Sequence, residues 1–228
     1  MALANRTFLN RVVRHLSGLG IKQFLDIGSG IRRTGNTHQI APDSRVVYVE
    51  HDPVAFAHGE VLLDEEGDPD RHAIVNVDLG LADAAWDEAL ATGILDPDEP
   101  VAVLLLSVLH ILRPNEVGTD LGADSVACFR KLIPFGSYLA VSHVTDEGVP
   151  LEIAPKLVEL KHLCDDLLNT SVWCRSQAAI KALFGDFQLL PPGLVWTPEW
   201  HPEEAAERVP FADRPSFAAV WGGVGQKI

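Results

Sequence analysis

The stretch FLDIGSGI, residues 24–31, decides the fold. It is a short apolar run that ends in Asp26 and then turns through two glycines, Gly28 and Gly30. An apolar run that stops at a glycine predicts a buried strand followed by a tight turn. Glycine adopts backbone angles closed to other residues and lets a ligand approach the main chain. The turn is therefore a candidate ligand site, although two glycines can also simply end a strand.

The composition predicts one domain over residues 1–228. The chain has 47% hydrophobic and 22% charged residues, as globular proteins do. Its 32 acidic against 18 basic residues give a net charge of −14, which disfavours nucleic acid as a partner. No apolar run reaches the roughly 18 residues of a membrane span, so we expect no membrane association. Three cysteines without a C-x-x-C pair indicate a reducing, cytoplasmic location. The nine histidines are scattered, so we predict no metal site.

Beyond this first strand, strand and helix patterns alternate for five units. The predicted strands are residues 21–28, 44–50, 72–79, 101–110, 137–144, 185–195 and 216–226. The predicted helices are residues 6–19, 52–63, 83–93, 122–132, 151–168 and a further one from about 176. This alternation is typical of a doubly wound, mostly parallel α/β sheet covered on both faces. We expect the last two strands to form an antiparallel edge.

Acidic residues end the first three predicted strands. In open α/β sheets, ligands bind outside the carboxyl ends of the strands. Asp26 could orient the loop or accept a hydrogen bond from a ligand's ammonium. Glu50 could accept hydrogen bonds from two ribose hydroxyls, and Asp78 could accept one from an adenine amino group. Glu50 could instead be a solvated acid beside Asp52, which caps the next helix. Asp78 could instead cap a helix. A dinucleotide fingerprint would place a third glycine where Arg33 stands. The pattern therefore favours S-adenosylmethionine (SAM), which carries an ammonium and a cationic sulfur, over NAD.

The motifs LDIGSGI, VVYVEHDP, VNVDLG, LLLSVLHIL and GSYLAVSHV resemble those of class I SAM-dependent methyltransferases. More narrowly, the chain from Asn5 onward resembles an actinobacterial methyltransferase family formerly catalogued as a domain of unknown function. The resemblance implies a Rossmann-like, seven-stranded, mostly parallel sheet with an antiparallel C-terminal strand, and SAM as the cofactor. The residues it implies for cofactor binding are Asp26, Gly28, Ser29, Gly30, Asn36, Glu50, His51, Asp52, Asp78, Leu79 and Ser107.

Methyl transfer to a hydroxyl or amine requires an oriented acceptor and the removal of a proton. The candidate catalytic bases are His110 and His143, which follow the fourth strand and end the fifth; each could instead only pack against a neighbouring loop. Residues 146–185 are expected to form a helical lid over a small-molecule acceptor that is methylated at oxygen or nitrogen. Trp173, Trp196 and Trp200 could line that pocket, but packing against the sheet is favoured. Arg175 could bind a carboxylate, but extension into solvent near the following helix is favoured. The protein is expected to be a monomer or homodimer.

Two departures from the family pattern keep an alternative open. Family members usually carry a segment upstream of the first helix, which this sequence lacks. The stretch THQIAPD is also shorter than its usual counterpart, so the first crossover helix should span only about a turn and a half. The alternative is a SAM-binding module without catalytic turnover. A weaker alternative is an NAD(P)-dependent oxidoreductase, which Arg33 and the lack of a Tyr-x-x-x-Lys pair disfavour.

Overall fold

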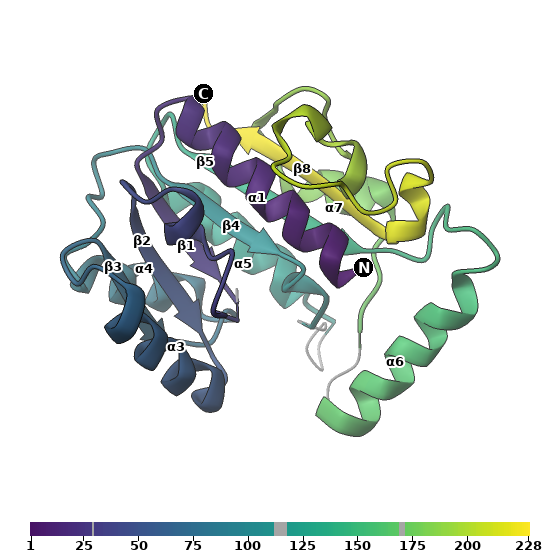
Figure 1. The fold of residues 1–228 in the computed structure, drawn as a ribbon, viewed down its shortest axis with the longest axis horizontal. Helices are drawn as coiled ribbons and strands as arrows, with labels where there is room; N and C mark the ends of the chain where they lie inside the picture. Colours follow the sequence, from purple (N-terminus) through teal and green to yellow (C-terminus); the bar gives the residue numbers. More distant parts are fainter. Residues whose placement is uncertain (29, 112–117, 169–171) are drawn as a thin grey trace.

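The computed structural model describes residues 1–28, 30–111, 118–168 and 172–228. Its strands form one sheet in the order β3-β2-β1-β4-β5-β8-β6, with β7 paired to β8 (Figure 1). The four pairs among β1 to β5 are parallel, and β8 runs antiparallel to β5, β6 and β7. The bounds are β1 Gln23–Ile27, β2 Arg45–Glu50, β3 His72–Asn76, β4 Ala102–Leu106, β5 Tyr138–Val144, β6 Gln188–Leu189, β7 Val195–Trp196 and β8 Val220–Gln226.

Helices cover both faces of this sheet, which confirms the doubly wound fold (Figure 1). One face packs against α4 (Ala82–Ala91), α5 (Leu121–Leu132) and α7 (Gln177–Leu183). The other packs against α1 (Ala2–Gly18) and α3 (Pro53–Glu66), with the four-residue α2 (Thr37–Ile40) beside them. The central strands β1, β4 and β5 are apolar on both sides and almost wholly buried, as expected for strands between two helical layers.

The strand order reverses at β1. The chain adds β2 and β3 on one side of β1 and then returns to place β4 on its other side. Connections that leave β1 and β4 in opposite directions open a crevice at the carboxyl ends of these two strands, where α/β proteins bind ligands. The glycine turn after β1 and the segment after β4 both lie at this crevice.

Local signals explain most helix starts. Asp52 caps α3 by accepting hydrogen bonds from the amides of Val54 and Ala55, and Pro53 occupies the first helical position, as predicted. Asp120 caps α5 and Ser176 caps α7 in the same way. The first crossover helix is indeed cut to a single turn, Thr37–Ile40.

Two predicted boundaries were wrong. The fourth strand ends at Leu106 rather than at residue 110, because Ser107 adopts a φ of +55° and breaks it. The predicted strand 185–195 is two short strands, since Pro191 and Pro192 cannot donate to a ladder. The expected antiparallel edge is confirmed: β6 is the last strand of the sheet and pairs antiparallel with β8, which lies between β5 and β6.

Helix α6 (Ala154–Leu168) projects from the body of the molecule (Figure 1). Near its start, Ile153 and Leu157 pack in a small apolar cluster with Val144 at the end of β5 and with Val172. Of the helices in the described part of the chain, none is long and apolar enough to cross a membrane.

Candidate functional site

The glycine turn after β1 has the geometry its sequence predicts. Gly28 has a φ of +64°, and a Cβ built there would lie 2.5 Å from Cγ2 of Val108. Its amide donates to the carbonyl of Val49, which fastens the turn to β2. Gly30 has a φ of +53° and open space where a Cβ would be. A glycine is thus required twice, at Gly28 for close packing and at Gly30 for backbone conformation. Ser29 lies outside the described residues.

Asp26 lies at the base of this turn and is only 3% exposed. Its Oδ2 accepts a 2.6 Å hydrogen bond from the Thr37 hydroxyl on α2. Burial raises the pKa of Asp26 to about 7; the Thr37 bond opposes the rise and the charge of Glu50 adds to it. A carboxylate so poorly solvated gains from an opposite charge, so the site favours a ligand cation beside Asp26.

The loop from Gly30 to Asn36 is held by its last residue. The Asn36 side chain accepts from the Arg32 amide at 3.0 Å and donates to the Arg32 carbonyl. The Asn36 amide in turn donates to Oε1 of Gln39, so the side chains of Asn36 and Gln39 cap α2 from both directions. Asn36 therefore shapes the loop, and it also lines the cavity described below.

Two serines connect the ends of β4 and β5. The Ser107 amide donates to the Ser142 carbonyl at 3.0 Å, and their hydroxyl oxygens are 3.3 Å apart. The Ser142 hydroxyl also bonds to the side chain of Asn5, on the first turns of α1. The N-terminal end of α1 is thereby fixed against the carboxyl ends of the central strands (Figure 1).

His110 lies on the 3-10 turn Leu109–Ile111 that follows β4. Its Nδ1 is buried and has no hydrogen-bond partner among the described residues. Burial, together with the charge of Arg175, lowers the pKa of His110 to about 4, so the ring is neutral near pH 7. In a neutral imidazole one ring nitrogen accepts a hydrogen bond and the other donates one, so the His110 ring can pair with a polar ligand group.

His143 is fully buried behind this ring, with the two ring centroids 6.1 Å apart. Its Nδ1 lies 2.7 Å from the Val144 carbonyl and its Nε2 lies 2.6 Å from Nη1 of Arg175. Nδ1 therefore carries the hydrogen and Nε2 accepts from Arg175. Burial lowers the pKa of His143 to about 3. Since both ring nitrogens are engaged, His143 is placed to support His110 rather than to face a ligand.

Arg175 was expected in solvent, and that expectation was wrong. It is 4% exposed and pairs with Asp120, the cap of α5, while also contacting His143 and the Leu109 carbonyl. Asp120 lies 55 residues earlier in the chain, so no local pattern could reveal the pair. The guanidinium ties the segment after α6 to the turn that carries His110.

The acidic ends of β2 and β3 stand at the same edge of the sheet. Glu50 is paired with Asn76 in the sheet register, and its Oε1 accepts from the amides of His51 and Asp52. Asp78 is exposed and accepts a hydrogen bond from the Gly80 amide. Helix α4 begins without a side-chain cap, so Asp78 does not cap this helix. Leu79 is buried in the core.

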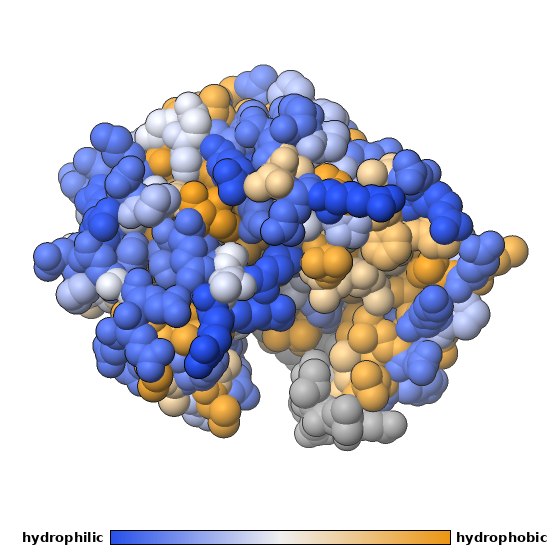
Figure 2. Space-filling view, in the orientation of Figure 1, coloured by the Kyte–Doolittle hydropathy of each residue, from blue (hydrophilic) through white to orange (hydrophobic). Residues whose placement is uncertain are grey.

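A cavity of about 520 Å³ lies between the glycine turn, the end of β4 and the N-terminal end of α1. Figure 2 shows this face of the molecule hollowed between the α3 side and α6, with more hydrophobic colour on the α6 side. The predicted residues that line the cavity are Asp26, Gly28, Gly30, Asn36, Ser107 and His110. The predicted residues that do not line it are Glu50, His51, Asp52, Asp78, Leu79 and His143.

The rest of the lining was not predicted. Asn5, Arg6 and Leu9 come from α1, Arg32 from the loop, and Leu160, Val172 and Val220 from α6, the segment after it and β8. The amphipathic pattern of residues 6–19 predicted the helix but contains no signal that its first turns reach the site. Among the described residues, no group of three histidine, cysteine or acidic side chains is placed to bind a metal ion.

Two of the tryptophans pack rather than line the cavity, as favoured. Trp200 is fully buried with its ring edge-on to Phe8 at 5.5 Å, and Trp196 stacks on Trp221 at 4.0 Å. Trp173 is 44% exposed. The carbonyls of Trp200 and Thr197 accept hydrogen bonds from the buried Arg11, which fastens α1 to the C-terminal segment.

The model of the S-adenosyl methyltransferase family matches residues 1–228. A candidate methyltransferase from Thermobifida fusca YX is 33% identical, with a TM-score of 0.80, and the match covers 99% of this chain and 81% of that one. A DUF574 family protein from Streptomyces avermitilis is 31% identical, with a TM-score of 0.82 and coverages of 99% and 83%.

More distant structures share the fold. One is an O-methyltransferase family 2 protein from Planctomyces limnophilus in complex with apigenin, at 19% identity and a TM-score of 0.56, with coverages of 90% and 51%. No curated protein matches the chain.

Proposed function

The chain belongs to the S-adenosyl methyltransferase family, and we propose that it transfers the methyl group of SAM to an oxygen or nitrogen of a small-molecule acceptor. Its enzyme class and its cofactor follow from the family. The acceptor and the residues that act on it are our proposal. The observation that carries the proposal is that His110, whose ring is neutral near pH 7, lines the same cavity as Asp26 and the glycine turn.

The described residues fit the cofactor. Asp26 is a buried carboxylate at the cavity wall and suits an ammonium. Gly30 leaves open space beside its backbone, so a ligand can approach the main chain there. Glu50, next to the turn on β2, is the candidate for the ribose hydroxyls, and Asp78 is the candidate for the adenine amino group; both lie at the sheet edge just outside the cavity. When bound, SAM supplies an electrophilic methyl group on a positively charged sulfur.

The chain's own residues have three tasks in this reaction. Leu106, Leu160, Val144 and Val172 supply apolar walls that exclude water and accommodate an apolar acceptor body. His110 accepts a hydrogen bond from the acceptor's O–H or N–H and so aligns its lone pair for in-line attack. Because its pKa is about 4, His110 orients the acceptor more than it stores the proton.

His143 and Arg175 keep His110 in place through the contacts described above. We infer that residues 146–185 cover the acceptor. Their contribution to the cavity wall through Leu160 and Val172 supports this role. An apigenin complex of a distant O-methyltransferase supports an acceptor of small-molecule size.

The test combines a transfer assay with a binding measurement. The purified protein is incubated with methyl-labelled SAM and fractionated small-molecule extracts, and S-adenosylhomocysteine formation is followed for wild type, His110→Asn and the exposed-surface control His58→Asn. We expect His110→Asn to lower turnover about 100-fold and to leave the affinity for S-adenosylhomocysteine unchanged, while His58→Asn behaves as wild type. Full turnover in His110→Asn, or an equal loss in both variants, would contradict the role given to His110.

A further inference from the structure

We propose that Arg6 and Arg32 form a carboxylate-binding subsite for the amino-acid end of the cofactor, in the cavity that Asp26 also lines. The subsite would let the cavity recognise a zwitterion, with the ammonium at Asp26 and the carboxylate at the two guanidinium groups. This inference rests on the placement of the cofactor proposed above.

Arg6 reaches the cavity from the second turn of α1. Its guanidinium lies directly over Gly35, where an added Cβ would be 2.6 Å from Nη2 and 3.1 Å from Nε. Any side chain at position 35 would therefore displace the guanidinium, and Gly35 also has a φ of +75°. Its one hydrogen bond to a described residue is to the Thr34 hydroxyl, at the limiting distance of 3.5 Å. Arg6 is thus half-buried, held in one place and almost unused by the protein.

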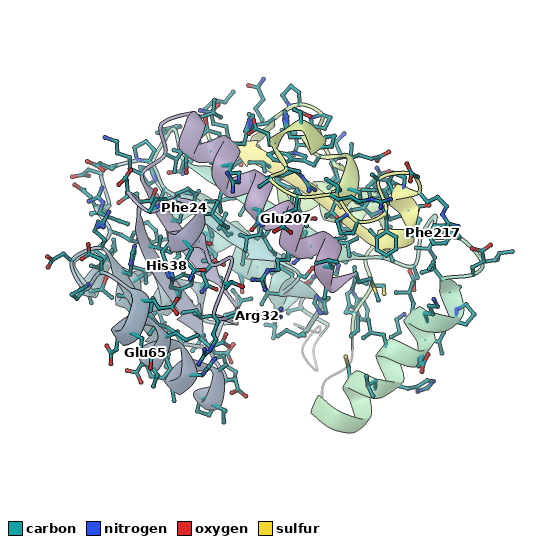
Figure 3. All side chains as sticks on the ribbon, viewed as in Figure 1. Phe24, Arg32, His38, Glu65, Glu207 and Phe217 are labelled. Carbon is teal, nitrogen blue, oxygen red and sulfur yellow. The ribbon has the colours of Figure 1, made fainter. Side chains whose placement is uncertain are left out.

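Arg32 lies on the loop between Gly30 and Asn36 and also lines the cavity. Its backbone is fixed because both its amide and its carbonyl bond to the buried Asn36 side chain. Its side chain forms no hydrogen bond or ion pair with any described residue. Figure 3 shows Arg32 near the carboxyl end of β1, on the side toward the N-terminal end of α1. Its position is therefore defined by its backbone, and its charge is available.

Among the described residues, neither Arg6 nor Arg32 forms an ion pair, whereas Arg45 pairs with Glu99, Arg130 with Asp186 and Arg175 with Asp120. Asp26 is the single carboxylate among the cavity-lining residues, and it is already bonded to Thr37. The cavity therefore combines one buried negative group with two free positive ones, which is the complement of an α-amino acid.

The chemistry favours a carboxylate over a phosphate. Arginine binds planar carboxylates through two parallel hydrogen bonds. A doubly charged phosphate would gain from the arginines but would be repelled by Asp26 in the same cavity. An α-carboxylate carries its ammonium one carbon away, so the two charges of the ligand can meet both signs of the cavity at once.

The experiment measures binding of two ligands by calorimetric titration. S-adenosylhomocysteine has both the ammonium and the carboxylate, while its decarboxylated analogue, 5′-S-(3-aminopropyl)-5′-thioadenosine, keeps the ammonium alone. The proteins are wild type, Arg6→Gln, Arg32→Gln and the matched control Arg33→Gln, which removes the same charge one residue away from a side chain that does not line the cavity.

We expect Arg6→Gln to weaken S-adenosylhomocysteine about 10- to 100-fold, as the loss of a charge-assisted hydrogen bond does. Arg32→Gln should weaken it less, because that side chain is more exposed. Affinity for the decarboxylated analogue should be unchanged in every variant, which also shows that the variants are folded, and Arg33→Gln should match wild type with both ligands.

Two outcomes would overturn the subsite alone: equal affinity of wild type for the two ligands, or an equal loss of both ligands in Arg6→Gln. If wild type bound neither ligand, the cofactor placement itself would be wrong, and the subsite with it.

Discussion

Replacement of Asp26 by asparagine should change how the stability of the protein depends on pH. Asparagine keeps an oxygen that can accept from Thr37, at nearly the same volume, but it cannot ionise. In the folded protein, burial raises the pKa of Asp26 from 3.8 to about 7. At 1.36 kcal/mol per pH unit, this difference corresponds to about 4 kcal/mol. That free energy is the cost of ionising the buried carboxyl.

The direction follows from the protons bound. Between about pH 4 and pH 7 the folded wild type holds a proton at Asp26 that the unfolded chain releases, so the free energy of unfolding falls as pH rises through this window and levels off above it. The Asp26→Asn variant has no carboxyl group at this position, so its free energy of unfolding does not fall in this way. The stability of the variant relative to wild type should therefore increase by up to about 4 kcal/mol from pH 4 to pH 8.

Denaturant unfolding of both proteins across this pH range measures the difference. The surface replacement Asp43→Asn serves as the control, because that side chain is fully exposed. A wild-type-to-variant difference that stayed constant with pH, or that moved in the opposite direction, would refute the burial argument for Asp26.

Three further predictions concern the turn, the buried ion pair and the second strand. Gly28→Ala should destabilise the protein more than Gly30→Ala, by about 1–3 kcal/mol. Both positions have a positive φ, but only a Cβ at position 28 would clash with Val108. Thermal unfolding of the two variants measures the difference. Arg175→Met should lower the free energy of unfolding by about 1–3 kcal/mol, because it leaves the buried Nε2 of His143 without a donor and Asp120 without its ion pair. Urea titration measures this loss, and an unchanged free energy of unfolding would contradict the argument. Glu50→Ala should weaken S-adenosylhomocysteine about 10-fold or more in a binding titration, whereas Glu60→Ala, on the exposed side of α3, should not.

The fold was largely predictable because its signals are local. Apolar runs ending in glycine or acid located the parallel strands, and Asp52 with Pro53 fixed the start of α3. The signals failed where the chain breaks its own pattern. The run 101–110 is apolar apart from Ser107 and His110, so only the positive φ of Ser107 reveals that β4 stops before it. The interior place of β8 depends on pairing with β5, a partner some 80 residues away in the chain.

The site was predictable on the side built from the glycine turn. Asp26, Gly28 and Gly30 are adjacent in the sequence, so their chemistry can be recognised together. Arg6 and Asn5 could not be recognised, because the face that α1 turns toward the cavity is set by tertiary contacts such as the bond between Asn5 and Ser142. The burial of Arg175 likewise depends on Asp120, which only the folded chain brings near.

The position of β8 affects how this protein can fold. Seven residue pairs join β8 to β5, and Val220 of β8 also lines the cavity. Until β8 has paired with it, β5 has an uncovered edge of unpaired backbone groups, and such edges are where partly folded chains associate with one another. The cofactor cavity is complete only after β8 has joined the sheet, so cofactor binding can stabilise the completed sheet but cannot guide the steps that precede it.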